Sequence, residues 1–200
     1  MVEYGTLSKS VCAEYVLKRS RFLCYAKPVS DEDGAAAFVR EISSKHWDAR
    51  HNAWAYTLRE GQRTRYSDDG EPQGTAGLPV IAAMRLRGVT DAVIVVTRYF
   101  GGILLGASGL TRAYAHSAGL GIEEAGVVTV RPVVRLRLAL PYSRYAQVER
   151  TIAQLGGTVA DSVFAENVTV TFDLPADSRI ALETALAEFA FGKTQECRLL

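Results

Sequence analysis

No stretch of this sequence approaches the ~20 consecutive apolar residues that a helix needs to cross a bilayer. The amino terminus, MVEYGTLSKSV, also lacks the basic segment and apolar run of a signal peptide. These absences argue against the common routes into or across a membrane. We therefore expect a cytoplasmic protein without a membrane partner.

Cysteine is scarce and follows no recognisable spacing. The chain has three cysteines, Cys12, Cys24 and Cys197, and no pair has CxxC spacing. An odd, widely spaced set argues against both a disulfide framework and a zinc site. A reducing compartment therefore fits this chain best.

An excess of either charge is also missing, since the formal net charge is +1 over 200 residues. Nonspecific binding to nucleic acid is dominated by a broad basic field, which this chain does not have. Any contact with RNA must therefore come from a local basic patch. The composition, 48% hydrophobic and 22% charged, is that of an ordinary folded protein.

Apolar periodicity predicts mixed strands and helices in the first part of the chain. The run AVIVVT after Asp91 is continuous, which predicts a central strand buried on both faces and ending near residues 98–100. Ser30, followed by three acidic residues, predicts the start of a helix. The other expected strands span 10–18, 21–28 and 51–58, and the expected helices span 30–46, 78–87 and 107–124.

The pattern changes from Val133 onward. It predicts a strand, a helix, two strands, a helix and a strand, at 133–141, 144–155, 158–164, 168–174, 176–189 and 193–199. This order is typical of a split βαβ, or ferredoxin-like, domain. The intervening segment Gly126 to Pro132 is the predicted linker, so we expect domains at 1–131 and 132–200.

Two glycine-rich segments flank the central strand: SDDGEPQGTAGLP at 67–79 and TRYFGGILLGASGLTRAY at 97–114. Glycine destabilises the interior of helices and strands, but it allows positive φ and a close approach of backbone to a ligand. So many glycines between apolar elements predict a shaped surface, and hence a functional site.

These two segments resemble the IMPACT/YigZ family, and the SRF at 20–22 and HNAWAY at 51–56 also fit its pattern. The resemblance implies an α+β fold with a ribosomal-protein-S5-domain-2-like amino-terminal domain and a ferredoxin-like, elongation-factor-like carboxy-terminal domain. It also implies a link to RNA or translation, with no established reaction. Eukaryotic members block activation of a kinase that phosphorylates an initiation factor, through a shared scaffold protein. That partner system is eukaryotic, so this role does not transfer directly.

The second glycine-rich segment leads into the helix at 107–124, where unpaired N–H groups and the helix dipole favour an anion. It matches neither a P-loop nor a dinucleotide-binding fingerprint, and we predict no cofactor. Arginines at the strand end and in the helix strengthen the interpretation as a site for phosphate or the RNA backbone. The predicted binding residues are Arg98, Tyr99, Gly101, Gly102, Gly106, Ser108 and Arg112.

Asp68, Asp69 and Glu71 lie within four positions of the first glycine-rich segment, with Thr75 close by. Clustered carboxylates can bind a divalent cation or act as acid and base if they converge on one point. They can equally shape a turn, as Asp-Gly and Glu-Pro do, or pair with an arginine of the second segment. We include all four residues in the candidate ligand- or RNA-binding site and assign no metal site.

Tyr99 is the predicted stacking platform for an unpaired base, since aromatic side chains beside a basic groove commonly bind bases. Phe100 is expected to point the opposite way, into the core. His51 and His116 could act as acid or base near neutral pH, but no Ser/His/Asp or Cys/His order accompanies them. We therefore assign no catalytic residue.

Arginines near the first glycine-rich segment would form a basic rim if they share a face, and are otherwise solvated surface residues: Arg59, Arg63, Arg65, Arg85 and Arg87. The leading hypothesis is a non-catalytic RNA- or ribosome-binding protein that modulates translation, with a possible protein partner in translation control. The alternative is an enzyme acting on a phosphorylated small molecule or nucleotide, for which the carboxylates would have to hold a metal. A protein–protein adaptor is a third hypothesis.

Overall fold

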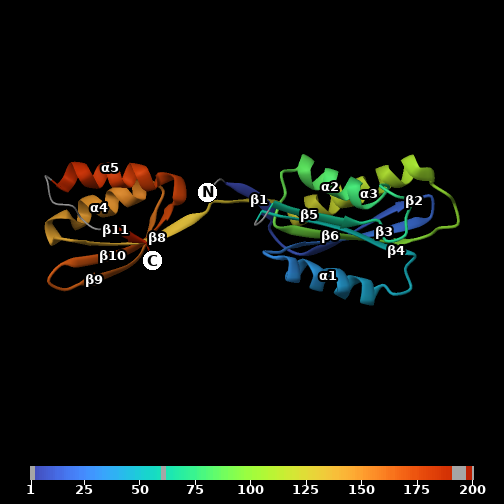
Figure 1. The fold of residues 1–200 in the computed structure, drawn as a ribbon, viewed down its shortest axis with the longest axis horizontal. Coiled ribbons are helices and arrows are strands. Elements are labelled where there is room, and N and C mark those ends of the chain that lie inside the picture. Colours follow the sequence, from blue (N-terminus) through green and yellow to red (C-terminus); the bar gives the residue numbers. More distant parts are fainter. Residues whose placement is uncertain (1–2, 60–61, 191–196, 200) are drawn as a thin grey trace. The chain divides into compact units, whose positions relative to one another are not determined.

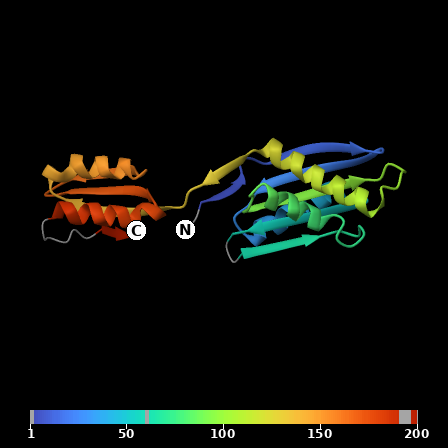
Figure 2. The same ribbon diagram turned by 90° about the horizontal axis from the view of Figure 1, so that it is seen from above.

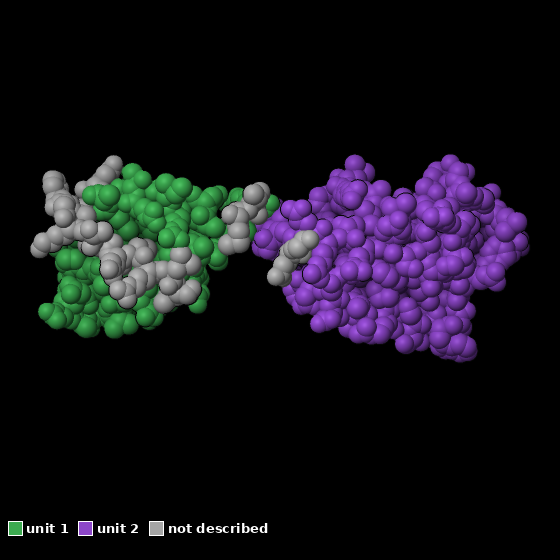
Figure 3. Space-filling view, in the orientation of Figure 1, with its two compact units in different colours: residues 1–3, 131–200 green, residues 4–130 purple. Residues whose placement is uncertain are grey.

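The computed structural model describes residues 3–59, 62–190 and 197–199 and divides the chain into two units. Tyr4–Val130 form one compact unit, and residues 131–200 with the first three residues form the other (Figures 1 and 3). Both units combine helices with antiparallel sheet. The predicted α+β, two-domain fold is therefore confirmed.

The larger unit is built on a five-stranded sheet in the order β2-β3-β6-β4-β5. Each neighbouring pair of strands is antiparallel. The central position of β6 agrees with its continuous apolar run. The strands are β2 (Val11–Leu17), β3 (Ser20–Pro28), β4 (His51–Leu58), β5 (Arg63–Ser67) and β6 (Ala92–Tyr99).

Helices cover both faces of this sheet (Figures 1 and 2). α1 (Glu32–Lys45) lies on one face, while α2 (Gly77–Leu86) and α3 (Gly106–Ala125) pack side by side on the other. The N-cap of α1 is Asp31 rather than the predicted Ser30, because Asp31 Oδ1 accepts a hydrogen bond from the Gly34 N–H at 2.7 Å. No helix in the described ranges is long and apolar enough to cross a membrane.

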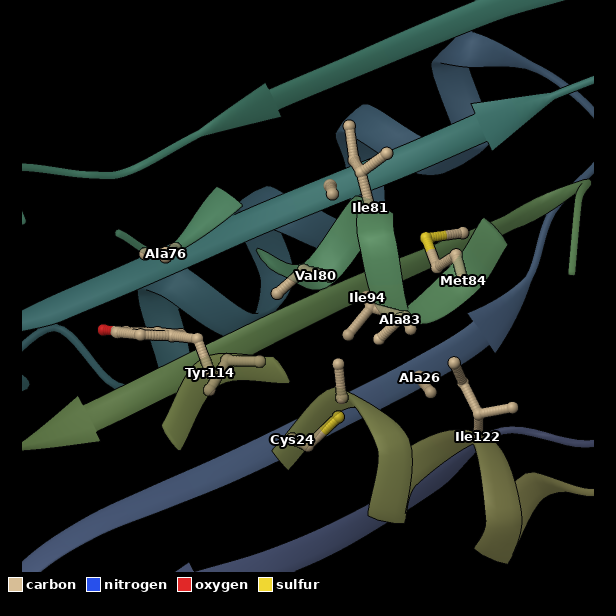
Figure 4. Packing of buried hydrophobic residues seen from close by; sticks show 14 of the residues in the cluster. Cys24, Ala26, Ala76, Val80, Ile81, Ala83, Met84, Ile94, Tyr114 and Ile122 are labelled. Atoms are coloured by element: carbon tan, nitrogen blue, oxygen red, sulfur yellow. The ribbon is translucent and has the colours of Figure 1, made fainter. Parts of the chain in front are cut away.

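Side-chain alternation along β6 divides its residues between two apolar layers. Ile94 and Val96 pack toward α2 and α3, in the layer shown in Figure 4 with Met84. Val93 and Val95 pack toward α1. All four β6 side chains are fully buried. The prediction that this strand is buried on both faces is confirmed.

Two segments of the larger unit differ from the sequence-based expectation. β5 is the polar segment RTRYS, whose pattern does not predict a strand, yet it pairs with β4 at the sheet edge. The predicted linker Gly126 to Pro132 is largely a strand, β7 (Val127–Val130), paired with β1 (Tyr4–Leu7). Segments this short show too little apolar periodicity to predict a strand. In addition, β1, the partner of β7, lies at the other end of the unit's sequence.

The smaller unit follows the order predicted from Val133 onward. Its sheet has the order β11-β8-β10-β9 with antiparallel neighbours, which is the ferredoxin-like arrangement. Residues 193–196 of the last predicted strand lie outside the described residues. The elements are β8 (Val133–Leu140), α4 (Tyr142–Gln154), β9 (Thr158–Phe164), β10 (Val168–Pro175), a 3-10 turn (Ala176–Ser178), α5 (Arg179–Ala190) and β11 (Cys197–Leu199).

Gly101, just after β6, lies against the tight turn between β2 and β3. Lys18 and Arg19 form this turn, with φ angles of 46° and 65°. The Gly101 N–H donates to Ser20 Oγ at 3.1 Å, and Ser20 is fully buried. A β-carbon on Gly101 would overlap the Arg19 carbonyl group and the Ser20 nitrogen. Glycine is therefore required for a contact that fixes where the chain leaves the sheet.

Gly101→Ala should destabilise the larger unit by roughly 3 kcal/mol or more, the upper end for an overpacked site, because the obstructing atoms are backbone atoms. Gly102→Ala is the matched control. Gly102 has a φ of 83° but open space around it, so alanine there should cost only about 1–2 kcal/mol for the left-handed backbone. Urea unfolding measures both changes, and equal losses of stability would contradict the close-approach argument.

Candidate functional site

Arg98, Glu71 and Tyr114 form a buried cluster where β6 approaches α3. The Arg98 side chain is 7% exposed and its Nη1 donates to Glu71 Oε1 at 2.7 Å, while the Glu71 side chain is 2% exposed. The Tyr114 hydroxyl, from α3, donates to the same oxygen at 2.8 Å. Tyr114 belongs to the apolar layer of Figure 4. This cluster joins the central strand, the first glycine-rich segment and α3.

The charges in this cluster compensate one another. Burying an ionised side chain is costly unless an opposite charge and hydrogen bonds accompany it, and Arg98 and Glu71 meet that condition. Burial, reinforced by the adjacent Glu71 carboxylate, raises the pKa of Tyr114 far above its ordinary value, so its hydroxyl stays a neutral donor. One donor remains: Arg98 Nε is buried and has no hydrogen-bond partner among the described residues.

His51, at the start of β4, faces the second oxygen of Glu71. Its Nδ1 lies 2.6 Å from the carbonyl oxygen of Asp69. A carbonyl oxygen can only accept a hydrogen bond, so Nδ1 carries a proton, and in the neutral tautomer Nε2 keeps its lone pair. Nε2 lies 3.9 Å from Glu71 Oε2, too far for a direct hydrogen bond. In that tautomer, two acceptors lie close together without bonding each other.

Arg98, Glu71 and His51 line a cavity of about 430 Å³ at the amino terminus of α3. The N-cap of α3, Leu105, supplies no side-chain hydrogen bond, so the first N–H groups of the helix have no capping side chain. Much of the wall is apolar. Other lining residues include Arg50, Pro72, Phe100, Leu104, Leu105 and Leu110.

The three carboxylates of the first glycine-rich segment diverge. Asp68 accepts hydrogen bonds from three backbone N–H groups at and before the start of α2, at 2.8–3.0 Å. Asp69 Oδ2 accepts one from the backbone of Asn52 at 2.6 Å. Glu71 alone lines the cavity, paired with Arg98. Turn shaping and arginine pairing, two of the predicted roles, are therefore confirmed. In the part of the chain that the structure describes, no group of three or more histidine, cysteine, aspartate or glutamate side chains could hold a metal ion.

The predicted glycines and hydroxyls lie at different depths. Gly101 and Gly102 lead away from β6, and Gly106 opens α3 and lines the cavity. Ser108 is exposed in the first turn of α3. Thr75 is buried, and its hydroxyl donates to a carbonyl oxygen of its own loop at 2.6 Å. Thr75 therefore stabilises the loop from inside.

Arg112 is exposed on α3 and lines a second hollow beside the cavity. Lys18 and His116 line the same hollow, and Leu105 lines both. The structure thus places Arg112 near the cavity but outside it.

The structure separates Tyr99 from Arg98, although the sequence analysis grouped them in one site. The Tyr99 hydroxyl donates to Asp48 Oδ1 at 3.0 Å and lies 2.9 Å from His46 Nδ1. His46 Nε2 in turn lies 2.6 Å from the Tyr25 hydroxyl. This network belongs to the α1 side of the sheet, because the strand's period of two turns consecutive side chains to opposite faces.

Phe100 is at the cavity, and the expectation that it lies in the core is wrong. It is 47% exposed and lines the cavity beside Arg98, whose Cζ is 5.6 Å from the ring centroid. β6 ends at Tyr99, so strand alternation no longer decides where residue 100 points.

Of the arginines that the sequence left open as a basic rim or as solvated surface, several pair with carboxylates away from the cavity. Arg63 and Arg65 pair with Glu32 at the start of α1, and Arg87 pairs with Glu123 of α3. None of these three lines the cavity.

Sequence reasoning missed Arg50 and Leu104 and considered His51 only as a catalytic group. The register of β4 against β6 places His51 opposite Arg98, which brings Arg50 to the cavity as well. Leu104 precedes α3 and is 83% exposed. The HNAWAY motif was the available signal for His51, but only the strand pairing shows which residue it faces.

Comparison with known proteins also divides the chain into two parts. Residues 18–122 match the model of the Impact N-terminal domain, and residues 138–193 match that of a domain of unknown function, DUF1949. The IMPACT family member YvyE of Bacillus subtilis (strain 168) is 34% identical over 192 residues, 96% of this chain and 88% of that protein. The IMPACT family member YigZ of Escherichia coli (strain K12) is 32% identical over 182 residues, 90% of this chain and 89% of that protein.

A eukaryotic relative and a solved structure are also similar. Protein IMPACT of Xenopus laevis is 30% identical over 93 residues, 44% of this chain and 30% of that protein. A crystal structure of a hypothetical protein, 30% identical, has a TM-score of 0.65 and covers 100% of this chain and 97% of that one. This similarity supports the fold of the whole chain.

Arg98→Met should destabilise the protein by about 3–5 kcal/mol, because it leaves the Glu71 carboxylate buried without an opposite charge. Glu71→Leu should cost a similar amount, and the double variant should cost less than the sum because neither charge remains. Urea unfolding of the four proteins gives the coupling energy. The exposed pair Arg21–Glu14 is the control, and its coupling should be much weaker because solvent screens both charges. Additive losses at Arg98 and Glu71 would contradict the compensation argument.

The network around His46 should make stability depend on pH. Burial first, and then Lys45, lower the pKa of His46 below its ordinary value. Such a histidine contributes stability above its unfolded pKa, about 6.5, and that contribution is lost as the pH falls through its lower folded pKa. The free energy of unfolding should therefore decrease from pH 7 to pH 5, less steeply in His46→Gln. Denaturant unfolding across this range measures both slopes, and identical slopes would exclude His46 as the cause.

Proposed function

Since this chain belongs to the IMPACT family, we propose that it is a non-catalytic RNA- or ribosome-binding protein that modulates translation. Bacterial relatives match it over most of their length, and eukaryotic proteins named IMPACT match part of it. The eukaryotic members regulate translation, which supports a role in the same process. The finer assignment to RNA or the ribosome rests on the charges beside the cavity.

The supporting observation is a set of exposed cations around the start of α3. Arg50 lines the cavity, Lys18 and Arg112 line the adjacent hollow, and the exposed Arg19 follows Lys18 in the turn whose backbone lies against Gly101. None of these four cations has a carboxylate oxygen within 4.0 Å in the described ranges. We call Lys18, Arg19, Arg50 and Arg112 the α3 cations. They form a local basic patch in a chain whose net charge is +1.

Arg98 adds little to this positive potential, because Glu71 neutralises it. Phosphate groups are therefore better matched to the α3 cations and to the uncapped N–H groups of α3, where the helix dipole favours an anion. Phe100 adds an exposed ring on which a base can stack. Contacts to phosphate without base reading suit RNA of many sequences.

The enzyme alternative has less support from the described residues. A phosphotransferase or phosphatase needs a metal ion or a nucleophile at the phosphorus. The carboxylates of the first glycine-rich segment each have an internal partner, and no serine, threonine or cysteine is among the residues that line the cavity. We keep this alternative as an outcome of the test.

Arg50→Ala and Arg112→Ala should each weaken binding to single-stranded RNA and to ribosomes. Each should also reduce the slope of log affinity against log salt by about 0.7 for a lost phosphate contact, because fewer counterions are released. Arg40→Ala is the matched control, since it removes one exposed cation from α1 on the opposite face of the sheet. Fluorescence anisotropy with labelled RNA at several salt concentrations, together with ribosome sedimentation, measures these effects.

A folded Arg50→Ala/Arg112→Ala double variant that binds RNA and ribosomes like the wild type would contradict the proposal. Absence of RNA binding together with turnover of a phosphorylated compound would favour the enzyme. Absence of both, together with capture of a translation protein, would favour the adaptor.

A further inference from the structure

The cavity at the start of α3 contains hydrogen-bonding groups that would not be used when the α3 cations bind phosphate. We propose that it receives one unpaired nucleobase with an exocyclic amino group beside a ring nitrogen, as in adenine and cytosine. This proposal rests on the proposed RNA binding by the α3 cations and adds a base preference to it.

Two acceptors define one side of the cavity. Glu71 Oε1 already accepts from Arg98 and Tyr114, whereas Glu71 Oε2 accepts no hydrogen bond within the described ranges. In the neutral tautomer with its proton on Nδ1, where it can donate to Asp69, His51 Nε2 keeps its lone pair 3.9 Å from Oε2. A group with two N–H bonds can donate to both atoms. The amino groups of adenine and cytosine are such groups.

Arg98 supplies the complementary donor. Its side chain is 7% exposed, it lines the cavity, and its Nε–H has no acceptor among the described residues. Gly106 and Ala107, whose N–H groups belong to the uncapped first turn of α3, line the same cavity. A ring nitrogen next to the amino group can accept from one of these donors. Uracil presents a carbonyl oxygen in place of the amino group, and that oxygen would face the acceptors Glu71 and His51 without a proton.

The walls suit a flat apolar ring. Phe100, Leu104 and Leu105 line the cavity, and the Arg98 guanidinium lies 5.6 Å from the Phe100 ring centroid. Stacking on an aromatic side chain is the usual way in which proteins hold a splayed-out RNA base. The volume, about 430 Å³, is within the roughly 300–1,000 Å³ range of small-molecule sites.

A phosphate group fits this interior less well than a base. The Arg98 charge is already balanced by Glu71, so an entering anion would meet a carboxylate with little net positive charge to offset the repulsion. A neutral base avoids this cost. The sugar and phosphates of the same strand can then lie outside, along the α3 cations.

Short labelled oligonucleotides of adenine, cytosine or uracil test the base preference by fluorescence anisotropy at one salt concentration. Adenine and cytosine should bind at least about fivefold more tightly than uracil, the lower limit for one good base contact. His51→Phe keeps a ring but removes the Nε2 acceptor, so it should reduce this preference and leave the salt slope unchanged. Urea unfolding confirms that the variant is folded.

Phe100→Ala tests the wall of the cavity at an exposed position, where the substitution is tolerated by the fold. It should weaken binding of adenine and cytosine oligonucleotides by about five- to 150-fold through lost stacking. Trp47→Ala is the matched control, because Trp47 is 84% exposed just after α1. That variant should bind like the wild type.

The outcomes separate the two proposals. Salt-dependent binding with equal affinity for all three oligonucleotides, unchanged in Phe100→Ala, would overturn the base pocket and leave RNA binding by the α3 cations intact. Absence of binding to any RNA would overturn both. A preference for adenine and cytosine that persists in a folded His51→Phe and in Phe100→Ala would place base recognition elsewhere.

Discussion

The buried ion pair between Arg98 and Glu71 is the contact on which the candidate site depends. Arg98 comes from the central strand, Glu71 from the first glycine-rich segment and Tyr114 from α3, so one carboxylate links three parts of the unit. Neither charge is tolerable alone in an apolar interior, and each is compensated only while these elements keep their positions. The geometry of the cavity is therefore coupled to the packing of the sheet against α3.

This pairing also determines how charge is distributed around the cavity. Its interior is close to neutral, while the α3 cations lie outside with no carboxylate partner within 4.0 Å in the described ranges. A neutral interior with directional hydrogen-bonding groups suits selection of a small planar group. A cationic exterior suits attraction of a polyanion, and the two properties are compatible because they act at different places.

Because consecutive side chains of a strand point to opposite faces of the sheet, the central strand contributes to two separate polar networks. Arg98 points toward α3 and the cavity, whereas Tyr99 points toward α1 and the hydrogen bonds with Asp48 and His46. The first network includes Arg98, which lines the cavity and whose buried Nε has no partner among the described residues. In the second network, Tyr99, His46 and Tyr25 contact one another through their polar atoms. The cavity residues lie within residues 18–122, the region that matches the Impact N-terminal domain.

The sequence by itself determined the α+β class, the buried central strand, the ferredoxin-like order and the position of the two glycine-rich segments. These follow from periodicity, turn chemistry and motif, which are local properties of the chain. It did not predict β5, because that polar segment lacks an apolar alternation, or the pairing of β7 with β1, because those strands are distant in sequence. Tertiary structure alone decided that Glu71 faces Arg98, that His51 joins them and that Phe100 rather than Tyr99 lines the cavity. Those outcomes depend on strand register and on where the chain leaves the sheet, and both are set by long-range packing.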